Sequence, residues 1–584
     1  MTLLRPAHAA RTRLLTALVA VVLILPLLFA GGLPTASAHG GALDAHGDET
    51  DPARNVPLPC EQVPTPGTPG RAARNIVHVA NVCGIVGTDV EFQSRRDSAG
   101  RIHNYAFVGT MGAGVRIYDV TRPATPIRAG GYIDTGWQND VQVRGDLLVS
   151  TFDGVVGEDS TASTCLKARY PEANGQGVDV IGLRFNPTTA KFTTVLATCI
   201  ANPPGGAHNS TLHVSGNYLA ISNPSSDWAV DVIDIRGVTR TGKTKHSYRL
   251  IDASRRNSPG RCPATADYRC ITVTRPNGTS ASGLWRPHDV SFSRDGKTMY
   301  VAALNATFIM DVSGVLDGSV RTIAIIPNKS NPADPDATEN IQLSHQADVS
   351  SDGKVLVVAD EKGGGTSNTN CNTSQGEKII GALHFYALTP LPGVAHSAGA
   401  SPSTPKKLGV YINPQPIVGP DVLQPVMRTL PRSERGCTVH VFRLGGNGTA
   451  GPGQIATGFD GISRLSSRRL TTAWYGAGVW HMDFSSRPDV LRGDTTREDP
   501  QTTWGNTLGW NVQPGADTWS AKEYKGYIYA GDIIRGFDVY RFATCDGAVA
   551  CRSTPSAAQR PASASAGLGA GTALAAAQRF VQVR

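Results

Sequence analysis

The sequence predicts an all-β protein: a seven-bladed β-propeller closed by an N-terminal strand, preceded by a signal peptide and followed by a disordered C-terminal tail. Three observations support this prediction. A short apolar strand recurs seven times along the chain. The 64 glycines and 38 prolines favour many turns over long helices. Beyond the N-terminal segment, no long run of residues has helical periodicity.

Residues 1–38 have the features of a signal peptide. Arg5, Arg11 and Arg13 form a basic region before the apolar segment LLTALVAVVLILPLLFA. Ala-Ser-Ala follows this segment as a cleavage site. An uncleaved anchor is the alternative, because the apolar run is close to membrane-spanning length. We expect a secreted, extracellular protein that begins near His39 and has no stable membrane anchor after cleavage.

Two polar segments flank the predicted propeller, which covers residues 75–543. Residues 39–74 are rich in Gly, Pro and Asp and are expected to form a flexible linker. Residues 544–584 are expected to form a cysteine-containing turn and a disordered Ala/Ser/Gly-rich tail. The net charge is +8, but most of it comes from arginines in the leader and the tail. The nearly neutral body argues against nucleic-acid binding, and we expect a monomer.

The chain has ten cysteines and no CxxC motif. An even number of cysteines in an exported protein favours disulfides over metal binding. We predict that neighbours along the chain pair, which gives Cys60–Cys83, Cys165–Cys199, Cys262–Cys270, Cys371–Cys437 and Cys545–Cys551.

An internal repeat is the most informative feature of the chain. A strand ending in aspartate reads GAGVRIYDV at 112–120 and GAGVWHMDF at 476–484, with weaker copies at 229–235, 306–312 and 535–542. An apolar strand such as NYLAISN or KTMYVAA precedes it. Each copy has three strands, often followed by a fourth. Units of four antiparallel strands must stack in a ring to bury both faces, which predicts a propeller.

The ends of the units carry two further predictions. The aspartates that close the repeated strand are interpreted as turn formers that accept backbone N–H groups. They are Asp119, Asp234, Asp311 and Asp483. The seventh unit stops after its third strand at Phe542, and NIVHVANV at 75–82 is expected to supply the missing outer strand, because an open sheet edge would invite aggregation.

The segments YAFVGTMGAGVRIYDVTRPATPIRAGGYI and GADTWSAKEYKGYIYAGDIIRGFDVYRF resemble the LVIVD repeat of exported bacterial β-propeller proteins. The resemblance covers roughly residues 75–543. It implies the propeller fold and no particular enzyme activity. The second and fifth units depart from the repeat by long insertions.

Three histidines share one spacing. His208, His288 and His345 each stand eight residues before a glycine that marks the turn between the first and second strands of a blade. His440 has the same spacing within a looser loop. Equal spacing places these side chains on one ring around the central channel that a propeller encloses. We expect neighbouring imidazoles to lie on the order of 5–10 Å apart.

Three interpretations of this ring remain open. The four histidines could bind a divalent transition metal with an open coordination position. Each imidazole could instead cap its blade by hydrogen bonding to backbone carbonyls. The channel mouth could also bind a ligand directly. Such a ligand would contact Asp89, Asp140 and Trp519, which lie in the comparable region of other blades, and Asp289, which follows His288.

Two functions follow from these alternatives. The first is an extracellular binding or interaction module for a protein, a glycan or a small molecule. The second is a metal-dependent hydrolase or redox enzyme centred on the histidines. The chain contains no GxSxG or HExxH motif. Propellers host both classes of function, so the sequence leaves open whether the protein is an enzyme.

Overall fold

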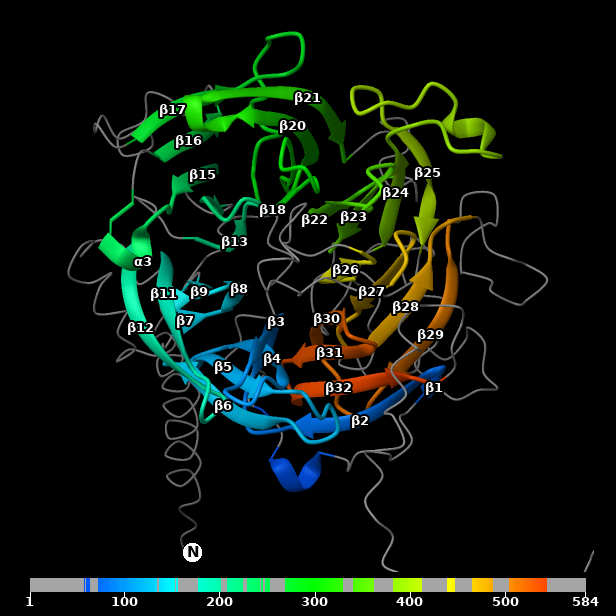
Figure 1. Ribbon diagram of the computed structural model, residues 1–584. Coiled ribbons are helices and arrows are strands. Elements are labelled where there is room, and N and C mark those ends of the chain that lie inside the picture. Colours follow the sequence, from blue (N-terminus) through cyan, green and yellow to red (C-terminus); the bar gives the residue numbers. More distant parts are fainter. Residues whose placement is uncertain are drawn as a thin grey trace, which may run out of the picture.

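The computed structural model confirms the seven-bladed β-propeller, with the blades arranged around a central channel (Figure 1). The structure describes residues 57, 59–63, 72–133, 136–152, 154–155, 177–200, 207–223, 228–241, 243–244, 247–252, 268–328, 340–361, 382–411, 439–446, 465–486 and 504–543. The predicted signal peptide and C-terminal tail lie outside these residues. Among the described residues, none of the helices has the length and apolar composition of a membrane-spanning segment.

Each blade is an antiparallel sheet whose strands follow one another from the channel outward. The first blade contains β3 (Gly87–Arg96), β4 (Ile102–Thr110), β5 (Gly114–Asp119) and β6 (Ile127–Tyr132). The second contains β8 (Asp140–Arg144), β9 (Leu147–Phe152), β11 (Gly177–Asn186) and β12 (Lys191–Ile200). The third contains β13 (Asn209–Leu212), β14 (Tyr218–Asn223), β15 (Ala229–Asp234) and β16 (Ser247–Asp252). The fourth contains β18 (Asp289–Phe292), β19 (Thr298–Ala302), β20 (Ala306–Gly314) and β21 (Ser319–Pro327).

The remaining blades follow the same order. The fifth contains β22 (Ser344–Val349), β23 (Val355–Asp360), β24 (Leu383–Ala387) and β25 (Lys406–Tyr411). The sixth contains β26 (Phe442–Leu444), β27 (Arg469–Ala473), β28 (Val479–Asp483) and β29 (Asn506–Val512). The seventh contains β30 (Thr518–Tyr524), β31 (Tyr527–Asp532) and β32 (Gly536–Phe542).

A few elements extend this plan. Strand β17 (Tyr268–Val273) pairs in parallel with β16, and β1 (Ala72–Arg74), at the end of the expected linker, adds a fifth strand to the sixth blade. Strands β7 (Gly136–Trp137) and β10 (Gly154–Val155) form a separate short pair. The short helices are η2 (Cys60–Gln62), α3 (Val238–Thr241), η4 (Val315–Asp317) and η6 (Ala395–Ser397).

An N-terminal strand closes the ring, as predicted. Strand β2 (Ile76–Val82) pairs antiparallel with β32 and is the outer strand of the seventh blade. Between the seventh and first blades, the rings of Phe92 and Tyr524 stack at a centroid distance of 4.7 Å. Burial of such a ring is worth about 1.5–3 kcal/mol, so this interface contributes to closure together with the strand pairing.

The Cys60–Cys83 disulfide is confirmed, with a Cα–Cα distance of 5.3 Å. Cys199 and Cys270 are also disulfide-bonded. Their predicted partners, Cys165 and Cys262, lie outside the described residues. So do both members of the two remaining predicted pairs, Cys371–Cys437 and Cys545–Cys551, and these four pairings stay predictions.

The turn residues behave as the repeat predicted. Oδ1 of each strand-end aspartate accepts the backbone N–H two residues later, at 2.8–3.1 Å; the four are Asp119, Asp234, Asp311 and Asp483. Gly216, Gly296 and Gly353 all have φ near +70°, at +68°, +72° and +73°. A side chain is strained in that left-handed conformation, which explains why glycine marks the same turn in three blades.

Candidate functional site

The innermost strands enclose a cavity of about 180 Å³ in the central channel. At one end it is lined by residues of the turns between first and second strands, including Val214, Arg294 and Ser351. At the other end it reaches His208, His345 and His440, at the beginnings of the inner strands. The cavity therefore runs along the inner strands and has chemically different ends.

The four predicted histidines form a continuous arc. Ring centroids are 4.1 Å apart for His208 and His288, 4.3 Å for His288 and His345, and 4.6 Å for His345 and His440. Trp519 continues the arc, with its ring 4.3 Å from that of His440. These distances are shorter than the expected 5–10 Å, and the rings of His288 and His440 reach the backbone of the neighbouring blade.

Hydrogen bonds between blades fix the direction in which two of the imidazoles point. Nδ1 of His288 lies 3.1 Å from the carbonyl oxygen of His345, and Nδ1 of His440 lies 2.6 Å from that of Trp519. A carbonyl can only accept, so Nδ1 is the donor in both cases. These bonds provide the capping role considered from the sequence. In the neutral imidazole, Nε2 is then the nitrogen that carries the lone pair.

A buried carboxylate meets the arc from a second strand. Glu361 follows the end of β23 and is 0% exposed. Its Oε2 lies 3.2 Å from Nε2 of His345, and its Oε1 lies 3.4 Å from Nε2 of His440. The Tyr475 hydroxyl donates a hydrogen bond to Oε1. The ligand atoms of His288, His345 and Glu361 all lie within 4.8 Å of one another.

Sequence reasoning did not find Glu361. It lies outside the inner strands, and its segment ADEKGGG has no counterpart in the eight-residue spacing of the histidines. His208 and His440 border the group of three without belonging to it. Metal binding by the predicted histidines stays a prediction.

The wall between the two ends of the cavity is polar and predominantly acidic. Five carboxylates line the cavity as a whole, against three basic side chains, of which Arg294 belongs to the turn end. The carboxylates are those of Asp89, Glu91, Asp140, Asp289 and Asp348, and the basic residues are Arg294, Arg443 and Lys522. The three aspartates proposed from the sequence as ligand contacts, Asp89, Asp140 and Asp289, thus share one cavity with Trp519.

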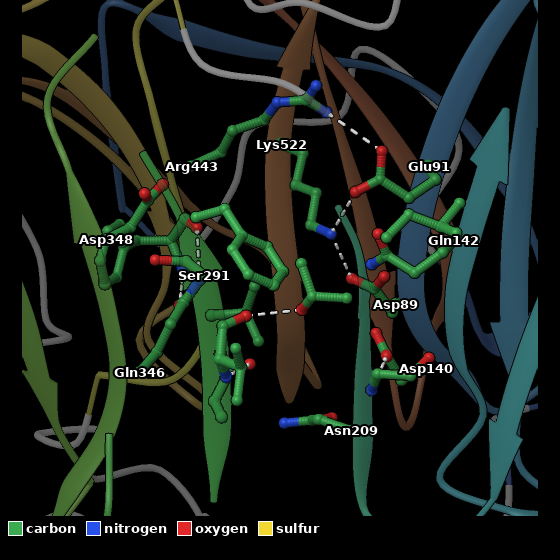
Figure 2. Close-up of a pocket in the computed structure, with 18 of the residues that line it drawn as sticks. Asp89, Glu91, Asp140, Gln142, Asn209, Ser291, Gln346, Asp348, Arg443 and Lys522 are labelled. Carbon is green, nitrogen blue, oxygen red and sulfur yellow. Dashed lines mark hydrogen bonds and ion pairs between the residues drawn. The ribbon is translucent and has the colours of Figure 1, made fainter. Parts of the chain in front are cut away.

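Lys522 neutralises one side of this wall. Its Nζ lies 2.6 Å from Oδ1 of Asp89 and 2.9 Å from Oε1 of Glu91, and Arg443 approaches the other oxygen of Glu91 at 3.8 Å. Burial alone would lower the pKa of Lys522, but the charges of Asp89 and Glu91 raise it above its usual value. Figure 2 shows Lys522 extended between the two carboxylates. The ammonium is therefore held in its charged form.

The neighbouring carboxylates are in a different state. Burial, followed by the charge of Asp89, raises the pKa of Asp140 well above its usual value. Burial is also the main cause that raises the pKa of Asp289, to about 7. Each accepts a backbone N–H, from Ser210 and Val290 respectively. Neither forms an ion pair with a lysine or arginine in the part of the chain that the structure describes.

Several cavity residues were missed although the sequence carries a signal for them. Asp348, Arg443 and Lys522 lie three residues after His345, His440 and Trp519, and Glu91 and Gln142 lie two residues after Asp89 and Asp140. The alignment of the histidines, extended two or three residues further along each first strand, identifies these cavity residues. Glu361 and Tyr475 have no such signal.

Comparisons with known proteins support no family assignment. No family model matches the chain, and no curated protein matches it. The solved structures that are similar to this chain include three at 10–12% identity. The Cps50 (Swd1) β-propeller domain of Myceliophteria thermophila has a TM-score of 0.40 and 10% identity, over 81% of this chain and 100% of that one. A putative 6-phosphogluconolactonase from Bacteroides fragilis has a TM-score of 0.36 and 10% identity, over 73% and 96%. A functionally unknown protein from Desulfotomaculum acetoxidans has a TM-score of 0.34 and 12% identity, over 69% and 84%.

Proposed function

We propose that the protein is an exported binding module whose central channel takes a small, positively charged ligand. The observation that carries this proposal is the surplus of carboxylates in a cavity where Lys522 already pairs with Asp89 and Glu91. Asp140 and Asp289 then remain as acceptors for a cation. The predicted signal peptide and the Cys60–Cys83 disulfide support the exported location, since disulfides persist in oxidising compartments.

A second observation supports a ligand in this cavity. Gln142 is 7% exposed and lines the cavity, and its Oε1 has no hydrogen-bond partner among the described residues. A buried amide oxygen without a partner costs about 1–3 kcal/mol. An ammonium or guanidinium group placed between Gln142 and Asp140 would donate hydrogen bonds to both. The acidic wall and the buried amide therefore favour the same ligand chemistry.

The size of the cavity limits the ligand. About 180 Å³ accommodates a small molecule or the end of a side chain and excludes a folded partner. An extracellular peptide presenting lysine or arginine, or a free polyamine, shares the required cationic group. The affinities of a free polyamine and of a peptide that contains lysine or arginine, measured in the same binding assay, distinguish these two sources.

Calorimetric titration of the mature protein with putrescine, a four-carbon diamine, tests the proposal. Butanediol of the same length is the matched neutral ligand. We expect saturable binding of putrescine alone, and a loss of at least about tenfold in affinity for Asp140→Asn or Asp289→Asn. The exposed Asp146, which pairs with Arg95 outside the cavity, supplies the control variant Asp146→Asn. Equal binding of the diol, or binding unchanged in both channel variants, would overturn the proposal.

A further inference from the structure

We propose that His288, His345 and Glu361 bind a divalent first-row transition metal ion at the histidine end of the channel. This proposal does not depend on the cationic ligand of the acidic wall. It rests on the three buried side chains, which are at most 3% exposed and whose ligand atoms lie within 4.8 Å of one another. Two imidazoles and one carboxylate are a donor set that suits zinc, cobalt or iron.

The distances already approach those of a metal centre. Metal bonds of 2.0–2.1 Å in a tetrahedral site place ligand atoms about 3.3 Å apart. Nε2 of His345 and Oε2 of Glu361 are separated by 3.2 Å, so an ion can sit between them without displacement of either. The ring of His288 lies 4.3 Å from that of His345 by centroid, and a modest rotation completes the set.

The hydrogen bonds around the group are those that orient metal ligands. Metal-bound histidine usually donates its second ring N–H to a carbonyl or carboxylate. His288 makes such a bond from Nδ1 to the carbonyl of His345, which directs Nε2 as the ligand atom. Glu361 is oriented in turn by the hydroxyl of Tyr475, which binds its other oxygen. Rigid inner strands hold both imidazoles, and the end of β23 holds the carboxylate.

His440, which lines the cavity, lies next to this group. Nε2 of His440 lies 3.4 Å from Oε1 of Glu361, the oxygen not assigned to the metal. His440 therefore acts as a positioning residue for Glu361, while a water from the cavity fills the fourth position. His208 contacts the ring of His288 and has no ligand role in this proposal.

Cobalt titration of the mature protein, after removal of bound metal, tests the site. We expect one equivalent of Co²⁺ to give the intense visible bands of a low-coordinate site, and Zn²⁺ to displace it. Glu361→Gln, His345→Gln and His288→Gln should each lower the affinity by more than about 100-fold, and Tyr475→Phe by roughly tenfold. His481→Gln is the matched control, because His481 is buried and hydrogen-bonded through Nδ1 to a carbonyl in the outer part of the sixth blade.

Three results would overturn the proposal. They are the absence of a one-equivalent cobalt spectrum, binding that persists in both Glu361→Gln and His345→Gln, and binding that is lost instead in Asp140→Asn or Asp289→Asn. X-ray absorption of the wild-type cobalt complex serves where a variant fails to fold: imidazole scattering with oxygen supports the site, and oxygen alone contradicts it. Failure of putrescine binding leaves these readouts unchanged, so the two proposals fail separately.

Discussion

His78 and Asp538 are 460 positions apart in the chain and are joined by a hydrogen bond of 2.7 Å between Nε2 and Oδ1. His78 belongs to the closing strand β2 and Asp538 to its partner β32. Arg535 binds the same carboxylate at 2.8 Å, and all three side chains are buried. His78, Arg535 and Asp538 therefore form a buried polar cluster that joins β2 to β32, where the backbone pairing closes the ring.

The first prediction concerns this cluster. Asp538→Asn leaves the buried guanidinium of Arg535 without its paired carboxylate. We therefore expect the free energy of unfolding to fall by about 3–5 kcal/mol. Denaturant unfolding checks this value. The control is Asp146→Asn, which removes an exposed partner of Arg95 and should cost less than about 1 kcal/mol. Equal effects of the two variants would show that the cluster does not stabilise closure.

The second prediction concerns the closing strand as a whole. Deletion of residues 39–83 removes β2 and exposes the edge of β32. We expect aggregation or loss of cooperative thermal unfolding, because an unpaired strand edge is free to pair with other chains. The deletion also removes the Cys60–Cys83 disulfide, which is worth roughly 3 kcal/mol for a loop of this size. A Cys60→Ser, Cys83→Ser variant isolates that contribution and should still melt cooperatively. A truncated protein that melts like the intact one would contradict the role of β2.

The third prediction is acid sensitivity of the same cluster. Burial alone would raise the pKa of Asp538, but the hydrogen bond from His78 and the charge of Arg535 lower it to about 2. The pKa of an aspartate in the unfolded chain is about 3.9. The ionised carboxylate therefore contributes about 2–3 kcal/mol above pH ~5, and this contribution disappears as the pH falls from about 4 to 2. The stability difference between wild type and Asp538→Asn, measured by denaturant unfolding, should shrink over that range. A constant difference would contradict the assignment.

The fourth prediction is the pH dependence of ligand binding. Only the ionised form of Asp289 attracts a cation, and burial raises the pKa of this group to about 7. Putrescine affinity should rise by up to about tenfold per pH unit below pH 7 and less steeply above it, where Asp289 is ionised and only Asp140, whose pKa burial also raises, still contributes. Calorimetry between pH 5 and 9 measures this profile. Asp289→Asn should reduce the slope below pH 7, whereas a profile that keeps its full slope in this variant would assign the titration to another group.

The fifth prediction is export with cleavage near Ala38. The basic residues, the apolar segment and the Ala-Ser-Ala sequence at 36–38 support it. N-terminal sequencing of the secreted protein should show a chain that begins near His39. A chain that retains Met1 or the apolar segment would favour the uncleaved anchor.

Much of the architecture was determined by the sequence alone, because it depends on local patterns. Alternating apolar residues define the strands, and glycines with positive φ mark the turns. The unit that ends at Phe542 without a fourth strand identified residues 75–82 as the closing strand. Equal spacing of His208, His288 and His345 was sufficient to bring their rings together, since each blade is a rotated copy of the last.

The tertiary structure decided which groups meet those histidines. Glu361 and Tyr475 come from connections after second strands of the fifth and sixth blades, and their distance from the arc depends on the stacking of whole blades. No local period encodes such a contact. The ionisation of the channel residues also depends on the tertiary structure. Lys522 meets Asp89 and Glu91 across the closure of the ring, and burial is the main cause that raises the pKa of Asp289 above that of a surface aspartate.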